Sequence, residues 1–242
     1  MKRISGMQYL IIFKLSNCFH FMSCVSLIIP RTVDVYFIFN LNYALMKYFL
    51  LCTLWILWCF LHSFLITTRI TIWFNNLLGG KFAYYRISYN LFSLITFLPL
   101  FYWQRTIPGP IVIPLSPYLM IFKYIAMVFS VIVIAGSFVS FDIWEFFGIR
   151  QTQKKEKRKV IQKHGFYRIV RHPMYLGAFV YFTASMTHVP LPQFLGYLIL
   201  AIYVIIGTFR EDRRLLRELG DIYREYQKEV PMILPGIARK KT

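Results

Sequence analysis

Long apolar segments separated by short basic segments are the feature that most constrains how this chain folds. A helix needs about 20 mostly apolar residues to cross the hydrocarbon core of a bilayer. Six segments approach that length: residues 8–29, 43–66, 87–104, 117–141, 174–190 and 192–209. Hydrophobic residues make up 57% of the chain and charged residues only 16%, whereas a soluble domain is roughly 25% charged. We therefore expect an integral membrane protein, an all-α polytopic transmembrane helix bundle with about five to six spans.

Two of these segments are unusual. The first, 8–29, is interrupted by Lys14, Asn17 and His20, so residues 1–42 form an N-terminal apolar segment of uncertain role. Residues 43–141 hold the next spans. The last two segments, 174–190 and 192–209, are separated only by a turn in the proline-bracketed stretch VPLP. Such a short connection predicts a helical hairpin, because it makes the two helices antiparallel neighbours.

The positive charge lies in patches between the apolar segments. The chain has a formal net charge of +18, with Lys and Arg gathered in 69–86, in 150–171 and after residue 210. Loops rich in Lys and Arg stay on the cytoplasmic side. We therefore expect a multi-pass protein of the cell inner membrane with these loops and both termini in the cytoplasm. Since the charge forms no continuous basic face, nucleic acid is not an expected partner, whereas membrane lipids are.

After Phe209 the sequence becomes charged but keeps a helical period. Apolar side chains recur at steps of three and four residues, which is typical of an amphipathic helix. These residues are Leu215, Leu216, Leu219, Ile222, Tyr223 and Tyr226. The pattern predicts one cytoplasmic amphipathic helix at the C-terminus.

The stretch VRHPMYLG, residues 170–177, carries a cation and an imidazole at the start of an apolar segment. Pro173 favours the first turn of a helix, and free N–H groups at a helix N-terminus attract anions. Because the hairpin returns to the same face, Arg171 and His172 should converge with Glu211 and Asp212. This arrangement suits a zwitterionic small molecule. The alternatives are head-group contacts of an ordinary juxtamembrane Arg and His, and an interfacial ion pair.

These residues carry a family resemblance. After VRHPMYLG come about 33 residues of hairpin, then the pair ED, and then Tyr223, Tyr226 and a V-P-x-x-x-P ending. This pattern resembles the integral membrane methyltransferases, which include isoprenylcysteine carboxyl methyltransferase and the phospholipid methyltransferases. Four more stretches resemble one branch of these proteins, the methanethiol S-methyltransferase and NnrU-type branch. They are LHSFL (61–65), YNLFSLI (89–95), YWQRTIPG (102–109) and FDIWEFFGIRQ (141–151). The resemblance implies that residues 142–242 are a methyltransferase core.

The resemblance implies S-adenosyl-L-methionine as the methyl-donating cofactor, bound on the cytoplasmic face. Tyr175 and Gly177 would shape the wall of its pocket. Glu211 matches the first acid of the family's Glu-Glu pair, which contacts the cofactor, and Asp212 is a departure from the second. The residues assigned to the pocket are Arg171, His172, Pro173, Tyr175, Gly177, Glu211, Asp212, Tyr223 and Tyr226. No metal site is expected.

The methyl acceptor implied by the thiol-methylating branch is a small thiol such as methanethiol, which would become dimethyl sulfide. A thiol needs a base to remove its proton, and His62 or Glu145 would take this role. The candidate groups on the substrate side are His62, Asp142, Glu145 and Arg150. One alternative is a lipid-like acceptor, either a prenylated cysteine or a phospholipid head group. Another is a non-catalytic membrane accessory protein. The sequence does not indicate an oligomeric state.

Overall fold

The computed structural model describes residues 35–79, 85–139 and 163–234. Within these residues the secondary structure is helical, apart from an isolated bridge between Ile111 and Pro190. The elements are α2 (Val35–Ile66), α3 (Thr68–Leu78), α4 (Tyr85–Thr106), α5 (Pro117–Phe138), the 3₁₀ helix η2 (Gly165–Arg168), α7 (Pro173–Ser185), α8 (Leu191–Leu219) and α9 (Asp221–Glu229). The all-α prediction is confirmed for this part of the chain.

The chain divides into two compact units, Met1–Lys47 and Tyr48–Thr242. Of the first unit only the beginning of α2 is described, where Lys47 Nζ lies 4.2 Å from the centre of the Tyr43 ring. The predicted first span, 8–29, lies outside the described residues. Every site considered below belongs to the second unit.

Three helices in the described ranges are long and apolar enough to cross a bilayer: Tyr43–Ile66 in α2, Pro117–Phe138 (α5) and Leu191–Leu219 (α8). The protein is thus an integral membrane protein, but the predicted five to six spans are not confirmed. Helix α4 coincides with segment 87–104 and is 22 residues long, yet it is not among the three. The segment 174–190 forms only the 13-residue α7. At 1.5 Å per residue this helix is about 20 Å long, which is shorter than a hydrocarbon core of about 30 Å.

Helices α2 and α4 pack antiparallel. Near one end Tyr48 Oη donates to the carbonyl of Pro108 at 2.9 Å. Further along α2, Trp55 Nε1 donates to Gln104 Oε1 at 3.1 Å. The core between them is apolar and is shared with α8, whose Leu200 packs with Leu51, Trp55 and Leu100. Gln104 Oε1 thus satisfies the buried Trp55 N–H, whereas no hydrogen-bond partner is found for the buried Gln104 Nε2 among the described residues.

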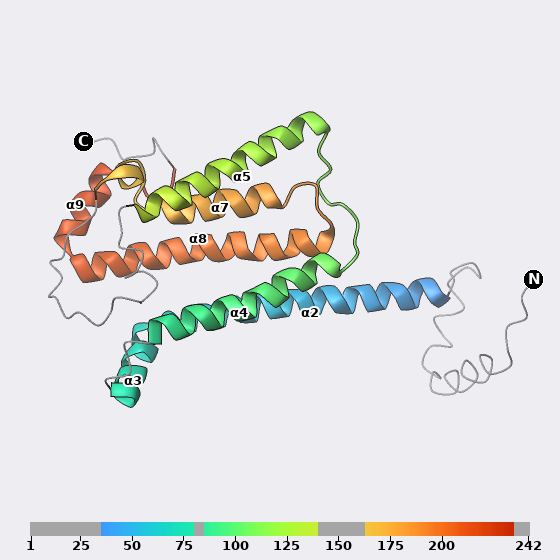
Figure 1. Cartoon of the computed structure of the whole chain (residues 1–242), viewed down its shortest axis with the longest axis horizontal. Helices are drawn as coiled ribbons and strands as arrows, with labels where there is room; N and C mark the ends of the chain where they lie inside the picture. Colours follow the sequence, from blue (N-terminus) through green and yellow to red (C-terminus); the bar gives the residue numbers. More distant parts are fainter. Residues whose placement is uncertain (1–34, 80–84, 140–162, 235–242) are drawn as a thin grey trace, which may run out of the picture. The chain divides into compact units, whose positions relative to one another are not determined.

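Helix α7 packs between α5 and α8 (Figure 1). Pro173 is its first residue, as the sequence predicts. Gly177 allows the close approach of α5, because a Cβ atom there would lie 2.6 Å from Ile134 Cγ1 and 2.8 Å from the Ser130 carbonyl. The predicted hairpin is present, since α7 ends at Ser185 and α8 begins at Leu191.

The region after Phe209 differs from the predicted single helix. Helix α8 continues to Leu219, and Gly220 then adopts φ 60°, a left-handed conformation that glycine reaches without steric cost. Helix α9 starts at Asp221 in a new direction. Tyr223, Tyr226 and Val230 pack against Leu215, Leu216 and Leu219. Ile222, which belongs to the apolar period in the sequence, is 52% exposed.

Candidate functional site

A buried polar cluster joins the start of α7 to α8 and α9, and Asp212 is its centre. Arg171 donates to Asp212 from Nε at 3.1 Å and from Nη2 at 3.3 Å. His172 Nε2 lies 3.0 Å from Asp212 Oδ1, and because a carboxylate only accepts, this nitrogen carries the proton. Tyr223 Oη donates to Asp212 at 2.6 Å and Gln227 Nε2 at 2.8 Å. One carboxylate on α8 thus accepts from four side chains on two other segments.

The same cluster fixes the chain that follows α9. Arg171 Nη1 donates to the carbonyl of Val230 at 2.5 Å, and the backbone N–H groups of Arg171 and His172 donate to the carbonyls of Pro231 and Met232. Burial, and then the neighbouring Asp212 carboxylate, raise the pKa of Tyr223 well above its ordinary value, so this phenol stays protonated and keeps donating. The arrangement fastens the C-terminal segment to the N-terminus of α7.

A polar cavity of about 410 Å³ lies beside this cluster, where α8 meets the end of α2. Its volume falls within the range of about 300–1,000 Å³ that is common for small-molecule sites. The lining residues that matter chemically are Ser63, Tyr175, Tyr203, Glu211 and the arginines Arg210, Arg213, Arg214 and Arg217. We call this space the polar pocket. It offers cations, one carboxylate and two aromatic rings.

Tyr175 and Glu211 are the two predicted site residues that line the polar pocket. The Tyr175 ring stands edge-on to the His172 ring at 5.8 Å and so connects the pocket to the buried cluster. Gly207 leaves room for Tyr175, since a Cβ atom at Gly207 would lie 3.2 Å from Tyr175 Cε1. Glu211 accepts from Arg214 at 2.6 Å and is only partly buried. Its carboxylate is therefore more accessible to a ligand than that of Asp212.

The structure brings the predicted cation, imidazole and acid together, but Asp212 rather than Glu211 receives Arg171 and His172. The two acids are adjacent on α8, so their side chains leave the helix about 100° apart. Tyr226 is buried and its hydroxyl donates to the Tyr167 carbonyl, which attaches α9 to η2. Gly177 contacts α5.

Of the predicted substrate-side residues, Asp142, Glu145 and Arg150 lie outside the described residues. His62 is near the end of α2, where its ring stacks on Trp58 with a centroid distance of 5.1 Å. Its Nδ1 lies 2.9 Å from Ser93 Oγ. An edge-on contact of 6.2 Å joins the His62 ring to Tyr203, which lines the polar pocket. His62 thus lies next to the pocket without lining it.

Several residues of the site were not found from the sequence. The arginines at 210, 213, 214 and 217 follow the steps three, one and three, which places them on one helix face, and that spacing could have revealed them. Tyr203 and Ser63 sit in apolar stretches and gave no signal. They are joined by a hydrogen bond of 3.0 Å across 140 positions of sequence.

The fold and the site together define a helical integral membrane protein with a polar pocket at one end of its spans. The sequence model of the NnrU protein family matches residues 50–229, so the chain belongs to that family. No solved structure matches the chain.

Curated relatives align over most of the chain. Methanethiol S-methyltransferase 2 of Bradyrhizobium diazoefficiens is 29% identical over 89% of this chain and 83% of its own length. Methanethiol S-methyltransferase of Mycobacterium tuberculosis is 29% identical over 86% of this chain and 85% of its own length. A methanethiol S-methyltransferase of Pseudomonas sp. is 35% identical over 38% of this chain and 37% of its own length.

Proposed function

We propose that this protein is a membrane methyltransferase that moves a methyl group from S-adenosyl-L-methionine to a small thiol, with methanethiol as substrate and dimethyl sulfide as product. The observation that carries the proposal is the similarity, over most of the chain, to relatives that bear the name methanethiol S-methyltransferase. Membership of the NnrU family and the three apolar helices support a membrane location. The positive-inside distribution of Lys and Arg supports an inner-membrane protein whose pocket faces the cytoplasm.

The chemistry of the polar pocket fits this methyl donor. S-adenosyl-L-methionine, when bound, supplies an activated methyl group on a sulfonium. The arginines of α8 would hold its carboxylate, because guanidinium groups match carboxylate geometry. Glu211 would hold its ammonium group. The Tyr175 and Tyr203 rings would face the sulfonium, since aromatic faces attract cations. Each charged group of the donor thus has an opposite partner among residues that line one cavity.

The buried cluster has a different part in this proposal. Arg171, His172 and Tyr223 bind Asp212, which lies next to Glu211 on α8. By fixing that turn of α8 they would hold Glu211 and Tyr175 in place for the donor. Positioning groups of this kind remove much of the entropic barrier to a bimolecular displacement. Pro173 fixes the start of the helix that carries Tyr175.

A base must remove the proton of the thiol that accepts the methyl group, because a thiolate is the reactive nucleophile. His62 is the described candidate base nearest to the polar pocket, through its contact with Tyr203. Glu145 remains a candidate base from the sequence, and Asp142 and Arg150 remain candidate groups on the substrate side. General base catalysis contributes typically about 10²–10⁴-fold in rate.

The deciding experiment supplies membranes that contain the protein with S-adenosyl-L-methionine and methanethiol. Headspace gas chromatography should show dimethyl sulfide above the level from membranes with an empty vector. A prenylated cysteine analogue and phosphatidylethanolamine are offered in parallel with labelled donor. Methylation of either lipid-like acceptor without dimethyl sulfide would contradict the thiol assignment. No methylation of any acceptor, together with no donor binding by calorimetry, would favour a non-catalytic protein.

A further inference from the structure

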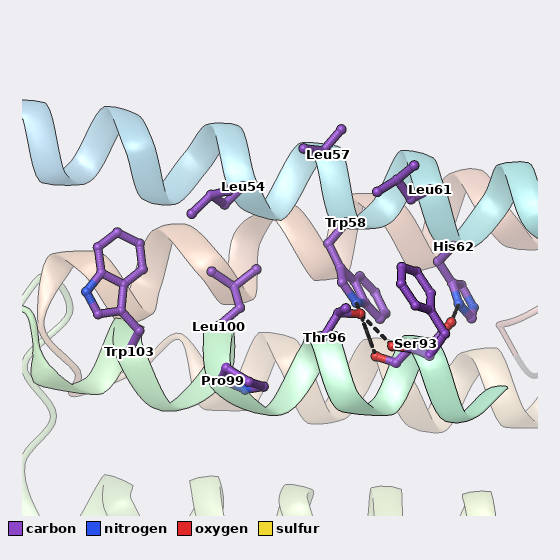
Figure 2. Close-up of a pocket in the computed structure, with 11 residues that line it drawn as sticks. Leu54, Leu57, Trp58, Leu61, His62, Ser93, Thr96, Pro99, Leu100 and Trp103 are labelled. Carbon is purple, nitrogen blue, oxygen red and sulfur yellow. Dashed lines mark hydrogen bonds between the residues drawn. The ribbon is translucent and has the colours of Figure 1, made fainter. Parts of the chain in front are cut away.

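A second cavity of about 410 Å³ lies between α2 and α4 and is almost entirely apolar. Figure 2 shows the leucines and tryptophans of both helices along it, with Leu54 and Trp103 toward one end and His62 and Ser93 toward the other. The polar side chains in its wall are His62, Ser93 and Thr96. We call this cavity the apolar groove.

The polar end of the groove is held in a defined arrangement. Trp58 Nε1 donates to Thr96 Oγ1 at 3.1 Å and is 3.3 Å from the Ser93 carbonyl. The His62 ring stacks on the Trp58 ring and forms a hydrogen bond with Ser93 Oγ. Among the described residues no hydrogen bond to His62 Nε2 is found. A polar side chain inside a spanning segment is costly, so such a residue is a functional candidate.

One residue of the polar pocket contacts the wall of the apolar groove. Tyr203 packs against His62 and Trp58 on the groove side. On the other side it lines the polar pocket, where its hydroxyl accepts a hydrogen bond from Ser63. A nucleophile bound beside His62 would therefore lie close to the polar pocket, with Tyr203 at the boundary.

We propose that the apolar groove is the binding site for a small uncharged thiol, and that Ser93 and Trp58 are positioning residues for His62. This inference rests on the proposed function. An uncharged alkanethiol dissolves in hydrocarbon, so it reaches the groove from the lipid side, where the outer faces of α2 and α4 carry exposed apolar side chains such as Ile56 and Ile95. Glu211 and the arginines line the polar pocket, where they would hold the donor.

Ser93 selects the tautomer of the His62 imidazole that can accept a proton at Nε2. When Ser93 Oγ accepts from Nδ1–H, the Nε2 atom keeps a free lone pair. The thiol proton passes to Nε2, the sulfur forms its bond to the methyl carbon as the bond from the donor sulfonium to that carbon breaks, and the imidazolium returns its proton to water. The products are the methyl sulfide and the demethylated donor.

The first test changes the size of the groove at Leu54, a half-buried lining residue. Leu54→Ala should raise the ratio of kcat/KM for 1-butanethiol over methanethiol by about tenfold or more, since one methylene in an apolar pocket is worth at least about tenfold in discrimination. Leu54→Phe should lower the ratio. The ratio does not depend on the folded fraction. Ile56→Ala, on the same helix but exposed, should leave the ratio as in the wild type.

The second test uses Ser93→Ala with two acceptors of similar size, ethanethiol and the more acidic 2,2,2-trifluoroethanethiol. The variant should lose up to about 100-fold in kcat with ethanethiol, the cost of a misplaced catalytic group, and much less with the acidic thiol, which gives up its proton more readily.

Unchanged chain-length ratios in both Leu54 variants, or equal losses with both thiols in Ser93→Ala, would overturn the groove assignment. A wild-type protein that methylates none of these thiols would instead contradict the proposed function.

Discussion

Replacement of Asp212 by alanine separates the role of the buried cluster from that of the polar pocket. Asp212 is 14% exposed and its partner Arg171 is 9% exposed. The change removes the acceptor for Arg171, His172, Tyr223 and Gln227 at once. It leaves a guanidinium buried without its counter-charge.

The magnitude follows from this burial. Removal of one partner of a buried ion pair costs about 3–5 kcal/mol, because the remaining charge is uncompensated. A chain of this size loses about 2–4 °C of melting temperature per kcal/mol. We expect Asp212→Ala to lower the melting temperature in detergent by about 6–20 °C. The polar pocket lies beside the cluster, so donor affinity should fall as a consequence of the displaced Glu211.

Glu211→Ala is the comparison variant. It removes a carboxylate that pairs with a half-exposed Arg214 on the helix surface, and exposed pairs contribute only about 0–1 kcal/mol. The melting temperature should change little, whereas affinity for S-adenosyl-L-methionine should fall by an amount typical of a charge-assisted hydrogen bond, about 1.5–3 kcal/mol. Asp221→Ala, at a 91% exposed carboxylate, serves as the control for both measurements.

Thermal unfolding followed by tryptophan fluorescence and calorimetric titration with the donor give the two readouts. The reasoning fails if Asp212→Ala melts within about 2 °C of the wild type, which is less than 1 kcal/mol, but no longer binds the donor. That outcome would make Asp212 a direct ligand. Loss of stability in Glu211→Ala of the size expected for Asp212→Ala would also contradict the assignment.

Three further predictions concern packing, topology and catalysis. Gly177→Leu should separate α7 from α5, because even a Cβ atom meets Ile134 at 2.6 Å, and overpacking costs about 1–3 kcal/mol; a fall of melting temperature below 1 °C would argue against this contact. Lys157→Cys should resist a membrane-impermeant maleimide in intact cells while Tyr118→Cys, which is 80% exposed at the start of α5, should react; the opposite pattern would invert the topology. His62→Ala should lower turnover of methanethiol by about 10²–10⁴-fold with unchanged donor affinity by calorimetry, and undiminished turnover would exclude His62 as the base.

Much of the helical architecture was predictable because it depends on local pattern. Apolar length predicted the helices at 43–66, 117–141 and 192–209, and Pro173 predicted the start of α7. Predictions from local sequence pattern failed where contacts with other segments determine the structure. The segment 174–190 has the composition of a span, but the chain leaves the helix after Ser185 and turns to pair with residues 111–115 through His188 and Val189. The composition of the segment does not show that hydrogen bonds to residues 111–115 compete with continuation of the helix.

The sequence by itself determined that the chain is a membrane-embedded helical protein and that a cation, an imidazole and an acid meet at one end of a hairpin. Those conclusions depend on spacing along single helices. Only the tertiary structure decided which acid meets Arg171 and which aromatic residue of the polar pocket contacts His62. Adjacent residues of a helix point about 100° apart, so the rotation of α8 against α7 buries Asp212 and turns Glu211 into the polar pocket. The same packing brings Tyr203 against His62, a contact between distant segments that no local period encodes.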